Sequence, residues 1–221
     1  MLFAAGFGTR MAPLTNSLPK PLIRVAGRPL VDHALDLLDG AGTGRIVANT
    51  HYKAEMMEQH LAERGVMCLR EPEILDTGGG LKNAIGLLGT GTVLTMNTDS
   101  VWAGSNPVEK LLAAWRPDTM DALLLMVPRD HALGHSGAGD FEIDCDGRIN
   151  RGLDMVYTGL QILKTDALHS ISKDKFSLNV VWDLIGAKRR LFGMPYAGQW
   201  CDVGRPENIG LAESMLGYAD V

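Results

Sequence analysis

Short apolar runs alternate with amphipathic stretches in the first half of the chain, and this alternation restricts the fold more than any other feature. The apolar runs cover 2–5, 46–49, 66–69 and 93–96, and apolar residues recur at helical spacing over 29–38, 53–64 and 108–115. Runs that are apolar throughout are typical of strands buried on both faces. The alternation of such strands with helices therefore predicts an α/β fold, with a mostly parallel sheet and helices on both faces.

After Asp121 the pattern changes to closely spaced strands. Segments 141–143 and 148–150 flank Asp144-Cys145-Asp146-Gly147, which is a hairpin signal. Further strands are predicted over 121–127, 155–163, 191–196 and 199–203, and helices over 178–190 and 205–216. The second half should thus add small antiparallel insertions and make the sheet mixed. Because no linker interrupts the chain, we expect a single domain over 1–221, with halves of about 1–120 and 121–221.

Composition excludes several classes of protein. The 221 residues are 46% hydrophobic and 21% charged, which indicates a buried core and excludes disorder. The net charge of -5 and the lack of a basic tract argue against a nucleic-acid partner. No apolar run approaches the roughly 20 residues that cross a membrane, and the N-terminus does not resemble a signal peptide. We therefore expect a cytoplasmic protein with no membrane partner, and no oligomeric state is predicted.

A glycine-rich turn, Ala5-Gly6-Phe7-Gly8-Thr9-Arg10, follows the first predicted strand. Glycines allow backbone N–H groups to approach a phosphate closely. A dinucleotide fingerprint would need a third glycine at Met11, and a Walker A loop would need a Gly-Lys pair, which the chain lacks. A third interpretation extends the site through Pro19-Lys20-Pro21-Leu22, so that Arg10 and Lys20 supply cations to a triphosphate. For the short turn alone, a glycine turn without a ligand remains an alternative.

Only five residues precede Gly6, which is close to the shortest length of a strand. The sequence leaves open whether residues before Met1 complete the first strand.

The run from Gly6 to Thr15, followed by Pro19-Lys20-Pro21-Leu22, resembles the signature of sugar-1-phosphate nucleotidylyltransferases. Members of that family join a nucleoside triphosphate to a sugar 1-phosphate and release pyrophosphate. The resemblance continues to the C-terminus and implies a Rossmann-like fold of the nucleotide-diphospho-sugar transferase type. It implies catalytic roles for Arg10 and Lys20. The residues that it implies in nucleotide binding here are Ala5, Gly6, Gly8, Thr9, Arg10 and Lys20.

Two aspartates stand at the ends of predicted strands. Asp99 follows the strand 93–96, and Asp202 lies near the end of the strand 199–203. Transfer between two polyanions needs a divalent cation, and Mg²⁺ prefers one or two carboxylates with phosphate oxygens and water. Met96-Asn97-Thr98-Asp99 and Trp200-Cys201-Asp202-Val203-Gly204 resemble the two metal-holding segments of the family. The resemblance therefore implies that Asp99 and Asp202 are catalytic and hold Mg²⁺. Thr98 stands where the family more usually has glycine, and an isolated aspartate at a strand end is more often a cap or turn residue.

The segment 71–80 follows the third predicted strand, and we expect it to form a loop that opens a helix at Leu81. The resemblance implies nucleobase contacts by Glu73, Thr77 and Gly78, and nucleotide contact by Asn97. A helix-terminal turn capped by Thr77 is the structural alternative.

Two segments of the second half resemble the sugar-binding parts of the family, Gly139-Asp140-Phe141 and Tyr157-Thr158-Gly159. The resemblance implies Asp140 and Gly159 as the main sugar contacts, with Gly139 and Thr158 as secondary ones. An Asp140 carboxylate that hydrogen-bonds its own backbone within the loop is the alternative.

Within the family, these segments are most similar to the uridylyltransferases that act on N-acetylmuramate 1-phosphate in bacterial peptidoglycan recycling. The resemblance thus favours UTP and that sugar phosphate as substrates. GTP with mannose 1-phosphate, dTTP with glucose 1-phosphate, and a non-catalytic nucleotide-sugar sensor remain open.

Three groups are given no functional role. His131 and His135 lie in a glycine-rich loop without the glutamate of a metalloprotease helix, and we expect a solvated loop. Asp144 and Asp146 belong to a turn rather than a calcium loop. Cys201 is expected to serve packing.

Overall fold

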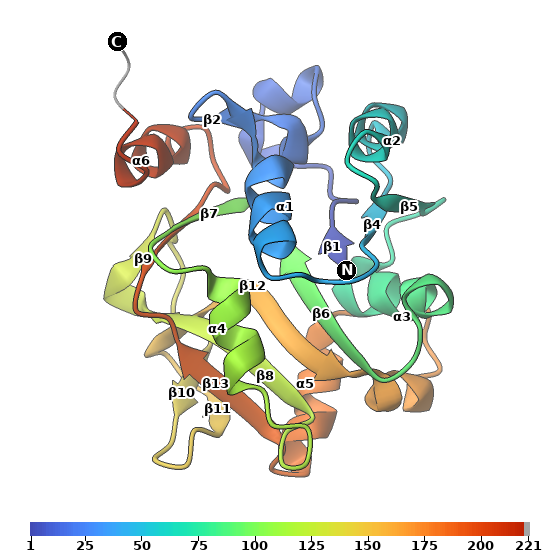
Figure 1. Ribbon diagram of the computed structural model, residues 1–221, viewed down its shortest axis with the longest axis vertical. Helices are drawn as coiled ribbons and strands as arrows, with labels where there is room; N and C mark the ends of the chain where they lie inside the picture. Colours follow the sequence, from blue (N-terminus) through green and yellow to red (C-terminus); the bar gives the residue numbers. More distant parts are fainter. Residues whose placement is uncertain (219–221) are drawn as a thin grey trace.

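The computed structural model describes residues 1–218, and the α/β architecture is that expected (Figure 1). None of the helices in that range is long and apolar enough to cross a membrane. The α-helices are α1 (Leu30–Gly40), α2 (Ala54–Ala62), α3 (Asp76–Leu88), α4 (Pro107–Ala114), α5 (Leu178–Ala187) and α6 (Asn208–Met215). The short 3-10 helices are η1 (Thr9–Met11), η2 (Leu14–Asn16), η3 (Lys20–Leu22), η4 (Arg129–His131) and η5 (Thr165–Ser170).

The main sheet is mixed, as predicted, and contains strands from both halves of the chain. Strands β1, β4, β5 and β6 are parallel neighbours, whereas β12 runs antiparallel to β6, β8 and β10. The hairpin β10–β11 and the parallel pair β8–β13 complete the sheet on the side of β12. Its strands are β1 (Leu2–Phe3), β4 (Val47–Thr50), β5 (Met67–Arg70), β6 (Thr92–Asn97), β8 (Ala122–Pro128), β10 (Phe141–Ile143), β11 (Ile149–Arg151), β12 (Met155–Lys164) and β13 (Leu191–Pro195).

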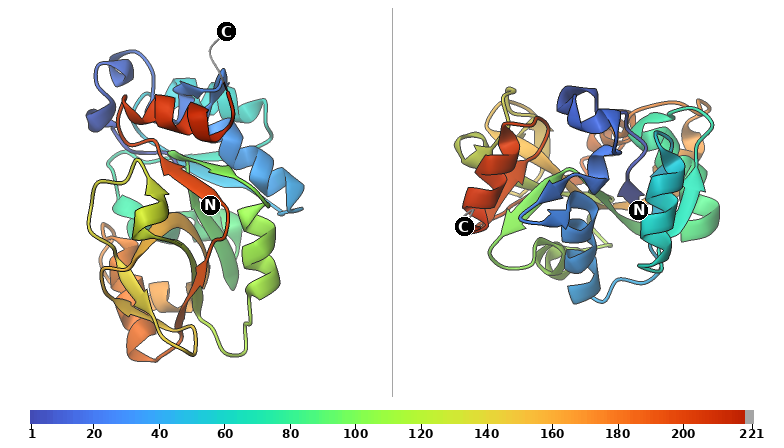
Figure 2. Two further views of the ribbon diagram at one scale, coloured as in Figure 1. Left: turned by 90° about the vertical axis from the view of Figure 1, so that its left-hand side faces the viewer. Right: turned by 90° about the horizontal axis from the view of Figure 1, so that it is seen from above.

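Helices cover both faces of this sheet, and each face has its own hydrophobic core. Figure 2 (left) shows α1 and α4 on one side and α5 on the other. Neighbouring residues of one strand alternate between the cores: Ala48 packs with α1, α2 and α4, whereas Val47 packs with α3 and α5. Each fully buried large apolar side chain contributes about 1.5–3 kcal/mol of transfer free energy. The two-sided burial explains why apolar residues stand at neighbouring positions of these strands.

A third layer lies at the end of the sheet where the glycine-rich turn begins. It is a small sheet in which β14 (Gln199–Asp202) pairs with β7 (Ser100–Ala103) and β9 (Ala132–Leu133). Neither β7 nor β9 was predicted. Cys201 is fully buried in its core, as expected, and burial raises the pKa of the thiol to about 11. The small sheet packs against the β2–β3 ribbon (Arg24–Val25 and Arg28–Pro29) and α6.

The helix predicted to begin at Leu81 instead begins at Asp76, so this boundary was wrong. Its three glycines, 78–80, are helical and buried. A Cβ on Gly78 would overlap the ring of Phe176, and one on Gly79 would overlap the Asp174 carbonyl. The glycines thus let α3 lie against the segment that leads into α5. This close packing outweighs the cost of about 1 kcal/mol for each glycine in a helix.

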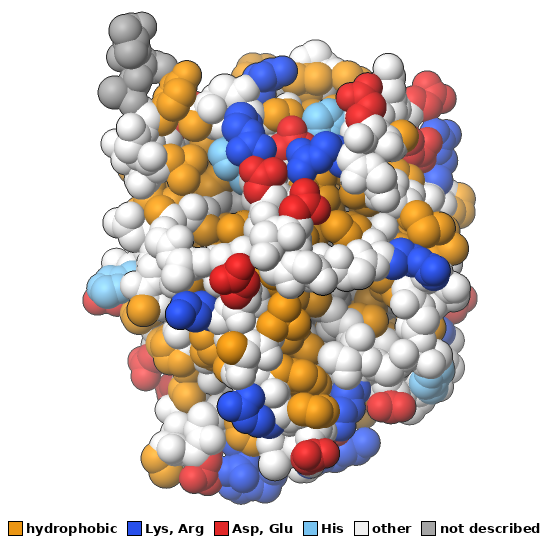
Figure 3. Space-filling model, in the orientation of Figure 1, with side chains coloured by type: hydrophobic (Ala, Val, Ile, Leu, Met, Phe, Trp, Pro, Cys, Tyr) orange, Lys and Arg blue, Asp and Glu red, His pale blue; other side chains and the backbone are white. Residues whose placement is uncertain are grey.

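Ion pairs join α1 to the residues after α2. Figure 3 shows acidic and basic side chains side by side over the upper part of the face on which α1 lies. Arg64 contacts Asp32, Asp36 and Asp39 of α1 at 3.2 Å each, and Arg28 pairs with Asp36 at 2.6 Å. Because most of these groups are partly solvated, each pair contributes at most about 1 kcal/mol. They orient the two helices more than they stabilise the fold.

The packing of α3 predicts opposite effects for two glycine substitutions in one helix. Gly79→Ala should lower the free energy of unfolding by about 1–3 kcal/mol, because its methyl group meets the Asp174 backbone. Gly86→Ala, whose added Cβ meets nothing within 4 Å, should raise it by about 0.5–1 kcal/mol. Urea unfolding of both variants measures the difference. Equal stability of the two would contradict the packing explanation.

Candidate active site

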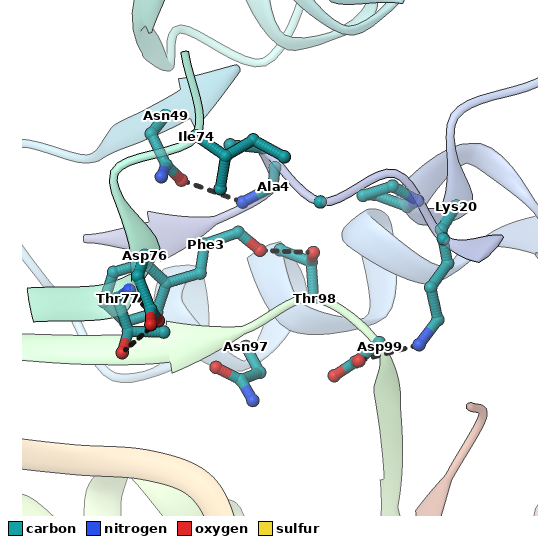
Figure 4. A pocket seen from close by; sticks show the side chains of 14 residues that line it. Phe3, Ala4, Lys20, Asn49, Ile74, Asp76, Thr77, Asn97, Thr98 and Asp99 are labelled. Atoms are coloured by element: carbon teal, nitrogen blue, oxygen red, sulfur yellow. Dashed lines mark hydrogen bonds and ion pairs between the residues drawn. The ribbon is translucent and has the colours of Figure 1, made fainter. Parts of the chain in front are cut away.

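A cavity of about 210 Å³ opens where β1, β4 and β6 end. Ligands of open α/β sheets bind at the carboxyl ends of the strands, so this is the expected place. Figure 4 shows its side chains converging from the glycine turn, the strand ends and the start of α3. The lining residues are Phe3, Ala4, Ala5, Gly6, Gly8, Lys20, Pro21, Asn49, Ile74, Asp76, Thr77, Asn97, Thr98 and Asp99.

The glycine turn is packed tightly on Lys20. Gly8 has φ +64°, and a Cβ there would lie 2.9 Å from both Lys20 Cβ and Thr15 Cγ2. Its carbonyl accepts hydrogen bonds from Met11 N at 2.9 Å and Thr15 Oγ1 at 3.1 Å. Both the left-handed backbone and the close contact therefore require glycine at this position.

An adjoining cavity of about 280 Å³ extends the site toward Arg10. Thr9 and Arg10 are exposed and line it together with Gly6, Lys20, Asp99 and others. The predicted turn residues Ala5, Gly6, Gly8, Thr9 and Arg10 thus all border the combined space.

Lys20 and Asp99 form the ion pair at the centre of the site. Lys20 Nζ lies 2.7 Å from Asp99 Oδ2, although the residues are 79 positions apart. Lys20 is only 9% exposed, so its ammonium needs a charged partner. The lysine has three N–H donors, which leaves it able to contact a second anion.

Asp202 is brought to the same place by the register of the small sheet. It lies opposite Ser100 in the β7–β14 pairing, and Val203 N donates to the Asp99 carbonyl at 2.8 Å. Burial raises the pKa of Asp202, and the nearby Asp99 carboxylate raises it further. The cations of Lys20 and Arg10 act in the opposite direction. Two aspartates and two cations therefore share one site.

Thr98, the departure from the usual glycine, does not project into the site as a free hydroxyl. Its Oγ1 donates to the Phe3 carbonyl at 2.8 Å and ties the end of β6 to the end of β1 (Figure 4).

The residues predicted to contact the nucleobase are only partly brought together. Thr77 and Asn97 line the cavity, whereas Glu73 is exposed outside it and Gly78 is buried against Phe176. The Thr77 hydroxyl accepts a hydrogen bond from Leu178 N, at the start of α5, at 3.0 Å, so it ties α3 to α5 and does not cap its own helix.

The predicted sugar residues divide in the same way. Gly159 has φ +85° at an irregularity of β12, and a Cβ there would lie 2.7 Å from Asn97 Cβ. Gly159 therefore adjoins a cavity residue. Asp140 accepts a hydrogen bond from Tyr157 N of β12 at 2.9 Å, so its carboxylate bonds to a neighbouring strand and not to its own backbone. Thr158 is buried and donates to the Leu125 carbonyl at 2.7 Å, and a Cβ on Gly139 would overlap the Leu153 backbone.

Two polar residues of the cavity lining, Asn49 and Asp76, were not predicted as site residues. Asp76 has φ +63°, which is unusual for a non-glycine residue. Asn49 could have been found because it ends a predicted strand.

The solvated-loop prediction is wrong for His135 and correct for His131, which is exposed. His135 is half-buried, and it lies close enough to Asp202 to lower the pKa of that carboxyl. Pairing of β9 with β14 and hydrogen bonds from Asn208 to the carbonyls of Gly134 and Asp202, both 2.9 Å, fix the loop there.

A mixed sheet, a glycine turn and two aspartates beside a buried lysine define a nucleotide-binding domain of the nucleotidyltransferase class. The chain belongs to the family of MobA-like NTP transferase domains, whose sequence profile matches residues 1–144. It is 38% identical to N-acetylmuramate alpha-1-phosphate uridylyltransferase of Caulobacter vibrioides, over 99% of this chain and 97% of that protein. The protein of the same name from Neisseria meningitidis is 31% identical, over 98% and 97%.

A solved structure shares the fold. It is that of a putative glucose-1-phosphate thymidylyltransferase from Bacillus anthracis, with a TM-score of 0.81 and 15% identity, over all of this chain and 95% of the other.

The raised pKa of Asp202 predicts that Asp202→Asn stabilises the protein in metal-free buffer. The folded protein resists ionisation of a carboxyl whose pKa is raised, so its free energy of unfolding falls as the pH rises from the unfolded-state pKa to the folded-state pKa. Asparagine does not ionise and therefore has no such pH-dependent cost. The variant should therefore have the higher Tm at pH 7.5, and the difference should vanish below about pH 4. Thermal unfolding at both pH values measures this. A lower Tm at pH 7.5 would mean that pairing with Lys20 and Arg10 dominates.

Proposed function

We propose that this chain transfers the uridylyl group of UTP to a sugar 1-phosphate, with N-acetylmuramate 1-phosphate as the preferred acceptor and pyrophosphate as the second product. The observation that carries the proposal is the Lys20–Asp99 pair, with Asp202 beside it, at the mouth of a glycine turn. The nearly full-length similarity to two uridylyltransferases supports the choice of substrates. The single domain would use residues 1–120 mainly for the nucleotide and 121–221 mainly for the sugar.

The glycine turn would hold the triphosphate of the nucleotide. Backbone N–H groups of Gly6, Gly8 and Thr9 suit phosphate oxygens, because glycine leaves no side chain in the way. Arg10, exposed at the outer cavity, would stabilise the pyrophosphate leaving group. The nucleoside would extend toward Thr77 and Asn97, which line the inner cavity.

The donor set of the site fits Mg²⁺. Asp99 and Asp202 offer two carboxylates, and the hydrogen bond from Val203 N to the Asp99 carbonyl holds their two segments side by side. Among the described residues, no three His, Cys, Asp or Glu side chains form a cage for a metal. Two carboxylates completed by phosphate oxygens and water are what Mg²⁺ usually binds. When bound, the ion would neutralise the triphosphate and polarise the attacked phosphorus.

The chemistry needs no general base from the protein. The phosphate of a sugar 1-phosphate is already ionised, and its oxygen would attack the α-phosphorus of UTP. One P–O bond forms, the bond to the β-phosphate bridge breaks, and pyrophosphate leaves with the negative charge. Lys20 would position the attacking phosphate, so positioning and charge neutralisation supply most of the rate enhancement. Gly159, which adjoins Asn97, would place the sugar on the β12 side.

The test is pyrophosphate release with Mg²⁺, in which UTP, GTP, dTTP, CTP and ATP are each combined with several sugar 1-phosphates, including N-acetylmuramate 1-phosphate. Highest kcat/KM for UTP with that sugar is expected. Preference for GTP with mannose 1-phosphate or dTTP with glucose 1-phosphate would keep the chemistry and change the substrates. Nucleotide binding without turnover across the panel would identify a sensor instead.

Asp99→Asn should lower kcat at least 100-fold, since several kcal/mol of charge stabilisation would be lost. Asp166→Asn, an exposed aspartate in η5, is the matched control and should leave kcat unchanged. Near wild-type turnover of a folded Asp99→Asn variant would refute the assignment of this carboxylate.

A further inference from the structure

A buried carboxylate with no part in the proposed chemistry lies behind the cavity. Glu71 is 1% exposed and directly follows β5. A buried carboxylate is costly unless hydrogen bonds satisfy both of its oxygens. The partners of Glu71 belong to two different walls of the cavity.

Both side-chain oxygens of Glu71 are satisfied. Oε1 accepts a hydrogen bond from Asn49 Nδ2 at 2.8 Å, and Oε2 accepts one from Leu75 N at 3.1 Å. The other end of the Asn49 amide, Oδ1, accepts a hydrogen bond from Ala4 N at 2.9 Å (Figure 4). A continuous chain of three hydrogen bonds thus runs from Ala4 to Leu75.

The two ends of this chain are the starting points of the two nucleotide-facing segments. Ala4 leads into the glycine turn, and Leu75 immediately precedes Asp76 and Thr77 at the start of α3. Glycine at position 80 leaves room for the connection, since a Cβ there would lie 2.8 Å from Asn49 Nδ2 and 2.9 Å from Glu71 Oε1. Asn49 and Glu71 therefore connect the turn to the α3 wall.

We propose that Asn49 and Glu71 are a positioning pair, which fixes the distance between the phosphate-binding turn and the wall that faces the nucleoside. The pair acts through Ala4 and Leu75 and does not touch the reacting atoms. The proposal rests on the proposed function only in taking a nucleoside triphosphate as the ligand that spans these two walls.

The directions of the hydrogen bonds allow the amide at position 49 and the carboxylate at position 71 to be exchanged with each other. Ala4 N, Leu75 N and the Asn49 amide nitrogen each need an acceptor. Glu71→Gln replaces one acceptor oxygen by a donor nitrogen, so one of these three donors loses its acceptor. Asn49→Asp alone places two carboxylates together. In the double variant Asn49→Asp/Glu71→Gln, the aspartate accepts from Ala4 N and from the glutamine amide, and the glutamine oxygen accepts from Leu75 N. All three bonds and the net charge are then restored.

Electrostatics alone predicts the opposite result for one variant. Glu71→Gln removes a negative charge close to a polyanionic ligand and would by that effect tighten binding. The positioning role instead predicts weaker binding, because the turn and the wall lose their fixed spacing. The sign of the change in Kd therefore separates the two explanations.

The experiment is titration calorimetry of UTP with Mg²⁺, together with steady-state kinetics. Each single substitution should raise the Kd and KM for UTP about tenfold or more, and the double variant should return to within about threefold of wild type. The KM for the sugar 1-phosphate should stay unchanged. Val108→Ala, a buried site on α4 remote from the cavity, controls for loss of stability alone and should leave the Kd for UTP unchanged.

Either of two results from the variants would overturn the proposal while leaving the proposed function intact: single variants that are folded by circular dichroism and bind UTP normally, or a double variant that binds no better than the weaker single one. Weakened and rescued UTP binding without transfer to any sugar would refute only the proposed function. Wild-type protein that binds none of the five nucleotides would refute both.

Discussion

The pairing of β7 with β14 holds two carboxylates, Asp99 and Asp202, next to each other, and much of the surrounding structure compensates for their repulsion. Burial raises the pKa of Asp202, and the neighbouring Asp99 carboxylate raises it further. The buried Lys20 ammonium lies between the glycine turn and Asp99, and it offsets part of this negative charge. The prolines at 19 and 21, the 3-10 turn η3 and the glycine at position 8 together bring the Lys20 side chain to that place. A site of this kind is built at the expense of stability.

The stability comes from elsewhere in the molecule. The two cores on either face of the main sheet contain almost only aliphatic and aromatic side chains, and they extend through both halves of the chain. The small sheet adds a third core, in which Val101, Cys201 and Val203 pack against Met11 and Ile23. Through Met11, this third core joins the end of the glycine turn to the strand that carries Asp202.

Local sequence predicted those parts of the fold in which local signals and tertiary packing agree. Val93–Met96 is mostly apolar because both its faces are covered, and its strand was predicted nearly to the residue. The strand at Ser100–Ala103 was missed because its only strand partner within the described residues lies a hundred positions away, at β14. The start of α3 was misplaced because glycine propensity opposes a helix, whereas packing on Phe176 requires glycine there. The predicted Lys20 and Asp99 meet directly, and Asp202 lies close to both, whereas the proximity of His135 depends on the β9–β14 pairing.

The junction of β6 and β12 limits how the two halves can act on their ligands. Here the parallel part of the sheet meets the antiparallel part, with Leu160 opposite Met96. Gly159 and Asn97 are in close contact at this junction, and any side chain at 159 would displace Asn97. Because one continuous sheet runs through both halves, they cannot close over a ligand as two independent bodies. On the proposed function, selectivity for the sugar would then depend on the shape of the surface around Gly159 and on the loops beyond it. The Asp140 and Thr158 side chains would serve this surface indirectly, since their bonds to Tyr157 N and the Leu125 carbonyl hold β12 in position.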